Sequence, residues 1–285
     1  MDGHSRLTPR PLGTLDPVQQ RPTARFEELV AGPEPDLAAA LDEAAALLAA
    51  HANPGLDVGA VLGRLDELAA GVQVASLAGL RHHLFEVVGF DGNHRSYHDP
   101  RNSFLDAVLD RRVGIPISLA VVTMEVGRRL GVALAGVALP GHFLVREGDG
   151  SAAAVNYVDP FRSGRLLDRD GCEALYRSMF GETAPFDDRL LAAVGPRAIL
   201  TRMLANLRSI YQASGDARSL GWALRLRAAI PAATPAELAD RASAQAALAR
   251  FGDAAVTLEQ LSTVLPRARA DRARATAALL RARLN

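Results

Sequence analysis

The spacing of apolar residues divides the chain into a helical first part, a mixed middle and a helical last part. Over residues 25–88 the apolar positions recur with a period near that of an α-helix, which predicts three or four helices. The clearest covers residues 37–51, with Asp36 as its expected N-cap, and is broken at Pro54. A second helix is expected over residues 56–70.

The middle of the chain changes from helical to strand-like patterning. Residues 103–112 predict a short helix capped by Asn102 or Ser103, and residues 117–131 predict a buried helix with Pro116 in its first turn. Three short apolar or alternating segments separated by turn residues then predict antiparallel strands: VALAGVAL at 132–139, HFLVRE at 142–147 and AAVNYVDP at 153–160. A buried helix followed by a strand meander is an α+β arrangement.

An internal repeat marks the last third of the chain. The segment at 207–231 is echoed at 244–266, with Gly-Asp at 215–216 and again at 252–253. A helix, a Gly-Asp turn, a second helix and a closing proline at that spacing are typical of tetratricopeptide-type repeats. We expect two such units within residues 195–285, packed on the domain that precedes them because each unit buries its apolar face only against a neighbour.

Composition narrows the classes of partner and compartment. The first 24 residues are polar and rich in proline, which predicts a disordered tail at 1–24. The chain has 285 residues, and its 32 basic and 32 acidic side chains give a formal net charge of +0. We therefore expect no nucleic acid or membrane partner. The lone cysteine, Cys172, is expected on a surface helix after the third strand; it excludes an intramolecular disulfide and fits a reducing cytoplasm. No export signal or membrane span is expected.

A polar loop before the buried helix contains several side chains of the types that bind metal ions or line pockets. Four histidines lie near one another in the sequence with acidic residues between them: His82, His83, His94 and His98. Their spacing does not place them on one helical face, so we expect solvated side chains, no metal site and no cofactor. A structured lid over a pocket is the preferred interpretation of the loop, with these residues in it: Asn93, Tyr97, Asp99 and Asn102.

Three ordered motifs carry a family resemblance. RRVGIPISLA, PGHFLVR and VDPF, followed by PRAILTRMLANLRSIY, resemble the bacterial SirB family of transglutaminase-like proteins with trailing tetratricopeptide repeats. The resemblance extends from about Arg25 to the C-terminus. It implies a transglutaminase-like domain of the papain-like cysteine-protease superfamily, with leading helices, over residues 25–190, followed by an all-α repeat region over residues 195–285.

The resemblance also implies a site. Active members of that superfamily use a cysteine at the start of a central helix, a histidine on the next strand and an aspartate on the strand after it. The helix start favours the thiolate, and the carboxylate orients the imidazole. His142 and Asp159 match the histidine and the aspartate. An ungapped match puts Pro116 at the cysteine position, and the nearby Ser118 is rotated by about 200° around the helix axis from it.

Two functions from different classes remain open at this point. The first is a cytoplasmic pseudoenzyme that binds a protein or peptide. It would use the cleft that holds the active site in active superfamily members, the repeat surface, or both. The second is an amide hydrolase or acyltransferase that uses Ser118, His142 and Asp159, or a proton-transfer site made of the last two alone. A Ser118 hydroxyl within hydrogen-bond reach of the His142 imidazole favours the enzyme, whereas a hydroxyl bonded to local backbone favours the binding protein.

Overall fold

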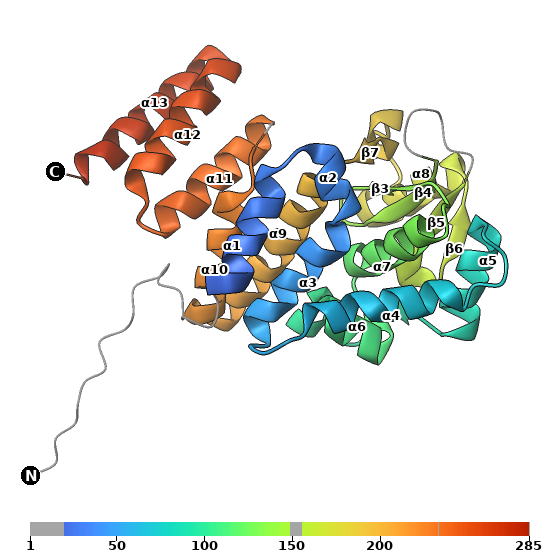
Figure 1. Cartoon of the computed structure of the whole chain (residues 1–285). Helices are drawn as coiled ribbons and strands as arrows, with labels where there is room; N and C mark the ends of the chain where they lie inside the picture. Colours follow the sequence, from blue (N-terminus) through green and yellow to red (C-terminus); the bar gives the residue numbers. More distant parts are fainter. Residues whose placement is uncertain (1–19, 149–155, 233, 285) are drawn as a thin grey trace, which may run out of the picture. The chain divides into compact units, whose positions relative to one another are not determined.

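The computed structural model of the protein describes residues 20–148, 156–232 and 234–284 (Figure 1). Most of the tail predicted at 1–24 lies outside these ranges. Its last five residues are helical, because α1 (Gln20–Ala31) begins ahead of the expected boundary. Pro22 is compatible with this start, since a proline in the first turn of a helix lacks only an N–H that would have no partner there.

The chain divides into two compact units. Glu28–Ile210 form one unit, and Tyr211–Asn285 form the other together with the residues up to Glu27. The boundary therefore falls within α9 (Pro196–Ser214), which the sequence assigned wholly to the repeat region.

Five helical segments come first in the larger unit. They are α2 (Glu34–Ala39), α3 (Leu41–Ala52), α4 (Val58–Ala70), α5 (Leu77–Arg81) and the π-helical turn η2 (His82–Val87). Asp36 is not an N-cap as predicted, because α2 begins two residues earlier behind Pro33, and Ala40 separates α2 from α3. Proline fixes its own φ and so marks this helix start more strongly than a nearby aspartate does.

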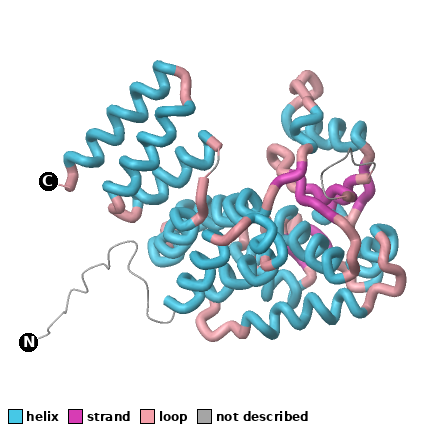
Figure 2. Tube along the Cα trace, turned by 45° about the horizontal axis from the view of Figure 1, so that its top comes forward, coloured by secondary structure: helices cyan, strands magenta, loops and turns pink. Residues whose placement is uncertain are grey.

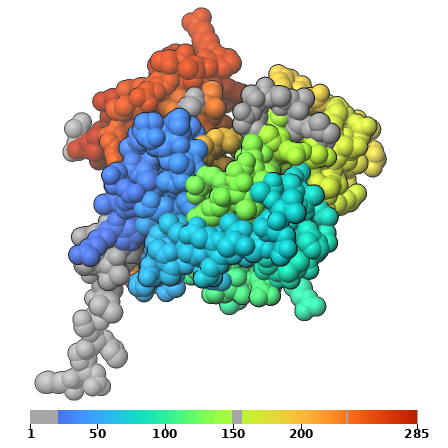
Figure 3. All heavy atoms as spheres, turned by 45° about the vertical axis from the view of Figure 1, so that its right-hand side comes forward, coloured from blue at the N-terminus to red at the C-terminus, as the bar shows by residue number. Residues whose placement is uncertain are grey.

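The central helix is α7 (Pro116–Arg129), which is buried from Pro116 to Gly127. Three short elements lead into it: η3 (Pro100–Ser103), α6 (Leu105–Arg111) and β2 (Val113–Gly114). The structure confirms α7 and the place of Pro116 at its first position. In the space-filling view, the cyan segment with α4 and α5 lies beside the green segment that follows α6 (Figure 3), and α4 contacts α7.

A five-stranded antiparallel sheet has the order β6-β5-β4-β3-β7. Its strands are β3 (Leu134–Val137), β4 (Leu144–Glu147), β5 (Tyr157–Asp159), β6 (Arg165–Leu167) and β7 (Ala193–Val194), drawn magenta in Figure 2. The first three match the predicted strands. The outer two are short and partly exposed, so they lack the apolar pattern by which a strand is predicted. A separate parallel pair joins β1 (Asp91–Gly92) to β2.

Helix α8 (Arg169–Phe180) packs on the sheet and changes the interpretation of the lone thiol. Two 3₁₀ turns, η4 (Pro160–Arg162) and η5 (Asp188–Leu191), flank the segment that contains it. Cys172 is fully buried in a cluster with Leu144, Tyr157 and Leu175. The expected surface position of Cys172 is therefore wrong. The helix has one apolar face, and Cys172 lies on it as a small hydrophobic group.

The smaller unit consists of successive antiparallel helices. After α9 come α10 (Ala217–Ala229), α11 (Pro235–Ala247), α12 (Phe251–Val264) and α13 (Arg267–Ala282), and each contacts the next from α10 onward. Asp216 caps α10, but Gly252 and Asp253 lie within the first turn of α12 instead of in a turn. There Ala249 takes the left-handed conformation that Gly215 takes in the first repeat. The helical region is as expected, and its tetratricopeptide class stays a prediction.

No helix in the described ranges is both long enough and apolar enough to cross a lipid bilayer.

Candidate functional site

The structure brings His142 and Asp159 together. The imidazole Nε2 lies 2.8 Å from Asp159 Oδ1, and the two side chains are 7% and 0% exposed. Asp159 ends β5, and His142 lies in the turn that leads into β4. Because Val145 pairs with Val158, the antiparallel register carries the end of β5 toward the start of β4. The sheet therefore builds the pair that the sequence predicted.

Further contacts fix the carboxylate and leave one imidazole nitrogen available. The Phe161 backbone N–H donates to Asp159 Oδ1 at 3.1 Å, and Arg162 Nε lies 3.9 Å from Oδ2. When Nε2 donates to Asp159, the neutral ring carries its lone pair on Nδ1. Within the described residues, Nδ1 has no hydrogen-bond partner. The pair therefore presents one oriented group that accepts, donates or transfers a proton.

Phe161 forms an aromatic wall that the sequence analysis did not single out. Its ring centroid lies 6.0 Å from that of His142, 4.4 Å from that of His94 and 5.9 Å from that of Tyr97. The available signal was its position in VDPF, since Asp159 caps the turn that begins at Pro160. Phe161 links the predicted lid to the predicted pair.

The predicted lid residues have two different roles. Tyr97 is 40% exposed and packs edge-on against Phe161, so it lies beside the pair. Asn102 is fully buried, and its amide donates to the carbonyls of Ser96 (2.7 Å) and Tyr97 (3.1 Å). It also accepts from Asn93 Nδ2 at 3.0 Å. Asn102 thus holds the loop in shape.

The helix after this loop begins without the predicted cap. Phe104 occupies the N-cap position of α6 and makes no side-chain hydrogen bond to it, because the amide of Asn102 serves the loop and Ser103 lies in the preceding 3₁₀ turn. Asp99 instead caps that turn by accepting from the Arg101 backbone N–H, and its carboxylate pairs with the Arg101 side chain at 2.7 Å. The side-chain hydrogen bond to Arg101, opposed by partial burial, lowers the pKa of Asp99.

The structure does not bring Ser118 to His142. The Ser118 hydroxyl is fully buried, accepts from the Ile115 backbone N–H at 3.1 Å and donates to the Asn102 carbonyl at 2.5 Å. It also lies 3.1 Å from the Ile115 carbonyl. None of its hydrogen bonds in the described part of the chain reaches the imidazole. Ser118 therefore stabilises the start of α7, as a hydroxyl in a first turn commonly does.

The start of α7 lies near the aromatic wall. Gly92 pairs with Gly114, two residues before Pro116, and a side chain at Gly92 would overlap Phe161. Pro116 itself is buried and occupies the first position of α7. The helix start is thus close to the His142 side of the molecule, and the residue there has no nucleophilic atom.

The remaining candidate groups do not supply a nucleophile or a metal site. Burial, with smaller contributions from Asp168 and Asp159, raises the pKa of the Cys172 thiol to about 12. Such a thiol carries almost no thiolate at neutral pH. Across the residues that the structure describes, no three or more His, Cys, Asp or Glu side chains are arranged to hold a metal ion.

Apolar and cationic side chains border His142. Met179 and Phe180, which are 38% and 51% exposed, lie against Gly141 directly before His142. Arg202 donates to the His142 carbonyl at a long 3.5 Å. Exposed large apolar side chains at a polar site are typical of surfaces that recognise another molecule.

Comparisons with known proteins place this site in a family. Residues 36–205 match the transglutaminase-like superfamily. A UPF0162 protein of Pseudomonas aeruginosa is 34% identical over 204 residues, which are 71% of this chain and 70% of that relative. A UPF0162 protein of Xylella fastidiosa (strain Temecula1) is 48% identical over 139 residues, 47% of this chain and 48% of the relative. The chain thus spans about half the length of that relative.

A mammalian protein shares the same kind of match over a smaller part of its length. F-box only protein 21 of Mus musculus is 33% identical over 150 residues, which are 50% of this chain and 23% of that protein. No solved structure matches the chain. The family match contains α7, the His142–Asp159 pair and the loop before them. The chain belongs to the transglutaminase-like superfamily and, within it, to the family of the UPF0162 proteins.

Proposed function

We propose that this protein is a cytoplasmic transglutaminase-like protein that binds a protein or peptide at the His142 site and does not carry out acyl transfer. The observation that carries the proposal is the buried His142–Asp159 pair beside a helix start that offers no thiol and no available hydroxyl. Such a pair retains its hydrogen-bonding capacity without a nucleophile to activate.

The chemistry of acyl transfer needs a group that the site lacks. Covalent catalysis at a helix start requires a thiolate or a hydroxyl within reach of the base. Pro116 has neither, and Cys172 is held protonated in the core. For the alternative, an amide hydrolase or acyltransferase with Ser118, the hydroxyl would have to give up its bonds to Ile115 and Asn102 and turn toward His142.

The surroundings of the pair support binding of an extended segment. Tyr97 lies against Phe161 on one side of His142, and Met179 and Phe180 lie against Gly141 beside it. These apolar groups supply buried area, and the imidazole Nδ1 supplies one directional hydrogen bond. The helical region contributes a second surface of a kind that often binds protein segments.

Peptide display tests the proposal directly. Random peptides displayed on phage are selected on the full chain, and the affinities of enriched peptides are then measured by fluorescence anisotropy. We expect Phe180→Ser and Tyr97→Ser each to weaken binding about tenfold, as loss of an apolar anchor commonly does. Val74→Ser, at a residue 61% exposed between α4 and α5, is the matched control and should leave the affinity unchanged.

Two outcomes would count against the proposal. The first is a set of enriched peptides whose affinity none of the site variants changes. The second is release of ammonia or amine from peptide amides that disappears in both Ser118→Ala and His142→Ala. That second result would establish the enzyme alternative.

A further inference from the structure

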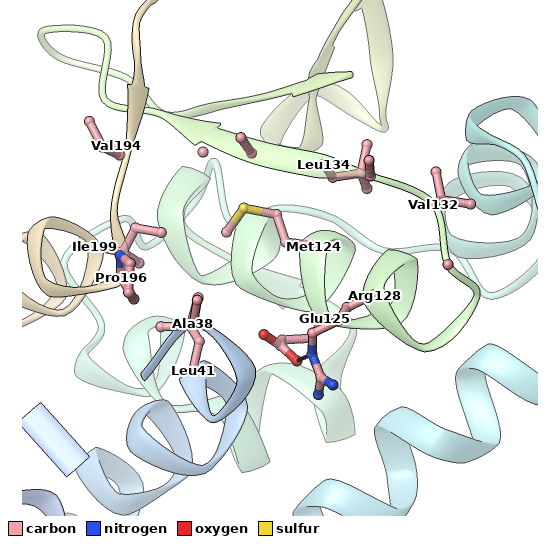
Figure 4. Close-up of a pocket in the computed structure, with 14 residues that line it drawn as sticks. Ala38, Leu41, Met124, Glu125, Arg128, Val132, Leu134, Val194, Pro196 and Ile199 are labelled. Carbon is pink, nitrogen blue, oxygen red and sulfur yellow. Dashed lines mark hydrogen bonds and ion pairs between the residues drawn. The ribbon is translucent and has the colours of Figure 1, made fainter. Parts of the chain in front are cut away.

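A cavity of about 400 Å³ lies beside the C-terminal half of α7, away from the helix start described above (Figure 4). Its walls come from α2, α3, α7, β3, β7 and the start of α9. Apolar side chains form most of the lining: Leu41, Met124, Leu134, Val194 and Ile199. A volume of this size is within the range of small-molecule sites.

One carboxylate oxygen in this cavity has no partner. Glu125 lines the cavity, and its side chain is only 3% exposed. Its Oε2 accepts from Arg128 Nε at 2.8 Å and from Arg129 Nη1 at 3.2 Å. Oε1 has no hydrogen bond among the described residues, and Figure 4 shows one carboxylate oxygen turned toward Ala38 and Leu41. This oxygen lines the cavity, so a ligand in the cavity could donate a hydrogen bond to it.

The charges around Glu125 favour a cation over an anion. Asp42 Oδ2 accepts from Arg128 Nη2 at 3.1 Å and from Arg129 Nη2 at 2.6 Å. Arg129 Nε also donates to Asp66 at 2.5 Å. Two guanidinium groups thus face three carboxylates from α3, α4 and α7. At the start of α9, Arg197 is paired with Glu34 and adds no net charge. With every group ionised, the cluster carries one net negative charge.

We propose that this cavity binds a small primary amine, whose apolar tail fills the space between α3, α7 and β3 and whose ammonium donates to Glu125 Oε1. The amine supplies both the missing hydrogen bond and the missing positive charge. Buried charges are tolerated when they are paired and hydrogen-bonded, and the ligand completes that condition for Glu125. The cavity lies at the other end of α7 from the His142 site, so this proposal is independent of the proposed function.

The pH dependence of binding follows from the same groups. Burial, followed by the nearby Asp42 charge, raises the pKa of Glu125 to about 7, although Arg128 and Arg129 act in the opposite direction. A simple alkylamine stays protonated up to about pH 10, like a lysine side chain. Below the pKa of Glu125 the ammonium must displace a proton, so affinity should fall about tenfold per pH unit. Above that pKa, affinity should be constant.

The test compares three unbranched six-carbon probes that differ in the polar end group: n-hexylamine, 1-hexanol and hexanoate. Each is titrated into the full chain at about pH 8 and followed by the backbone amide signals of β3 in NMR spectra. We expect hexylamine to bind about tenfold more tightly than hexanol and hexanoate. Glu125→Gln keeps the size of the side chain and should remove that preference. Glu67→Gln, at an exposed position on α4, is the matched control and should keep the preference for hexylamine.

A second variant keeps the result interpretable. Ala38 lines the cavity from an exposed position on α2, so Ala38→Phe should close the cavity and abolish binding of both hexylamine and hexanol. The proposal is overturned if Glu125→Gln binds hexylamine as tightly as the parent chain does. A preference for hexanoate, or the absence of any signal shift at millimolar amine, also overturns it.

Discussion

The two ends of α7 lie near two buried acidic groups that are compensated in different ways. Near the N-terminal end, one imidazole and one backbone N–H are both bonded to Asp159 Oδ1. In the C-terminal half, Glu125 shares two arginines with Asp42 and keeps an oxygen without a partner. Asp159 Oδ2 is buried without a hydrogen bond, with Arg162 Nε 3.9 Å away, whereas Glu125 Oε1 faces a cavity.

This difference indicates where new ligands are to be sought. A superfamily site draws attention to the N-terminal end of α7, where the imidazole Nδ1 and the buried Asp159 Oδ2 have no hydrogen bond among the described residues. The C-terminal half has an open cavity of about 400 Å³, an acceptor without a hydrogen bond that lines it, and an excess of negative charge. The four predictions below test whether the two ends differ as described, from the largest expected effect to the smallest.

Removal of Asp42 should have the largest effect. Asp42→Ala leaves Arg128 and Arg129 with Glu125 as their main buried partner, and breaking a buried ion pair commonly costs about 3–5 kcal/mol in the free energy of unfolding. Urea denaturation at neutral pH measures the loss. Asp36→Ala, at an exposed site on α2, is the control and should change stability by less than about 0.5 kcal/mol. A loss below about 1 kcal/mol for Asp42→Ala would contradict the prediction that the ion pairs of Asp42 stabilise the fold.

Glu125→Gln should stabilise the protein at high pH. The folded-state pKa of about 7 lies above the ordinary value of 4.5, so the folded state binds more protons than the unfolded state between these values. Stability should therefore fall as the pH rises from about 4.5 to about 7, by up to about 3 kcal/mol. Glu125→Gln removes this dependence, because the neutral amide resembles the protonated acid.

Urea denaturation at several pH values measures the free energy of unfolding of the parent chain and of Glu125→Gln. We expect the variant to be the more stable chain above about pH 7 and to have a flatter profile below it. A parent chain whose stability rises through the same window, with no difference in the variant, would show that Glu125 is an ordinary carboxylate.

Disruption of the His142–Asp159 pair should have a smaller effect. His142→Ala leaves the fully buried Asp159 carboxylate without its imidazole partner, which should cost about 1–3 kcal/mol. Thermal melts of His142→Ala and Asp159→Ala measure the cost. His82→Ala is the control, because His82 forms an exposed bond with Glu86. Unchanged melting temperatures for both variants of the pair would show that it contributes nothing to the fold.

The smallest expected effect is a shift in the pKa of an introduced thiol. In a Cys172→Ala background, Pro116→Cys places a thiol at the first position of α7, where the helix dipole favours an anion. Alkylation by iodoacetamide against pH should give a pKa below the ordinary value of about 8.5, rising again with His142→Ala. Ser118→Cys should be inaccessible. If the thiol at 118 is instead the reactive one, the ungapped match to the superfamily is wrong.

Local sequence pattern was sufficient for the elements that bury one continuous face. The apolar run after Pro116 predicts α7, and the alternating segments predict the three central strands. The pair of His142 and Asp159 was implied by the family resemblance, and the register of β4 and β5 brings the two residues together. For α7 and the strands, the deciding contacts are between neighbours in the chain or in adjacent strands, so periodicity predicts them.

The errors share a different cause. Asn102 was predicted to cap α6, but its amide is bonded to Ser96 and Tyr97 within the loop. Cys172 was placed on the surface, but the sheet covers it. Gly252 was placed in a turn that forms at Ala249 instead. Each of these side chains or turns had more than one local option, and packing selected among them.

The sequence by itself determined that this chain has a buried helix, a following sheet and a histidine–aspartate pair without a cysteine at the helix start. Only the tertiary structure decided what Glu125 does. In the sequence, Glu125 is an acidic interruption of an apolar run. The carboxylates of Asp42 and Asp66, which share Arg129 with Glu125, come from α3 and α4, far earlier in the chain. The physical reason is that desolvation and charge balance depend on which elements pack together, and no local pattern contains that information.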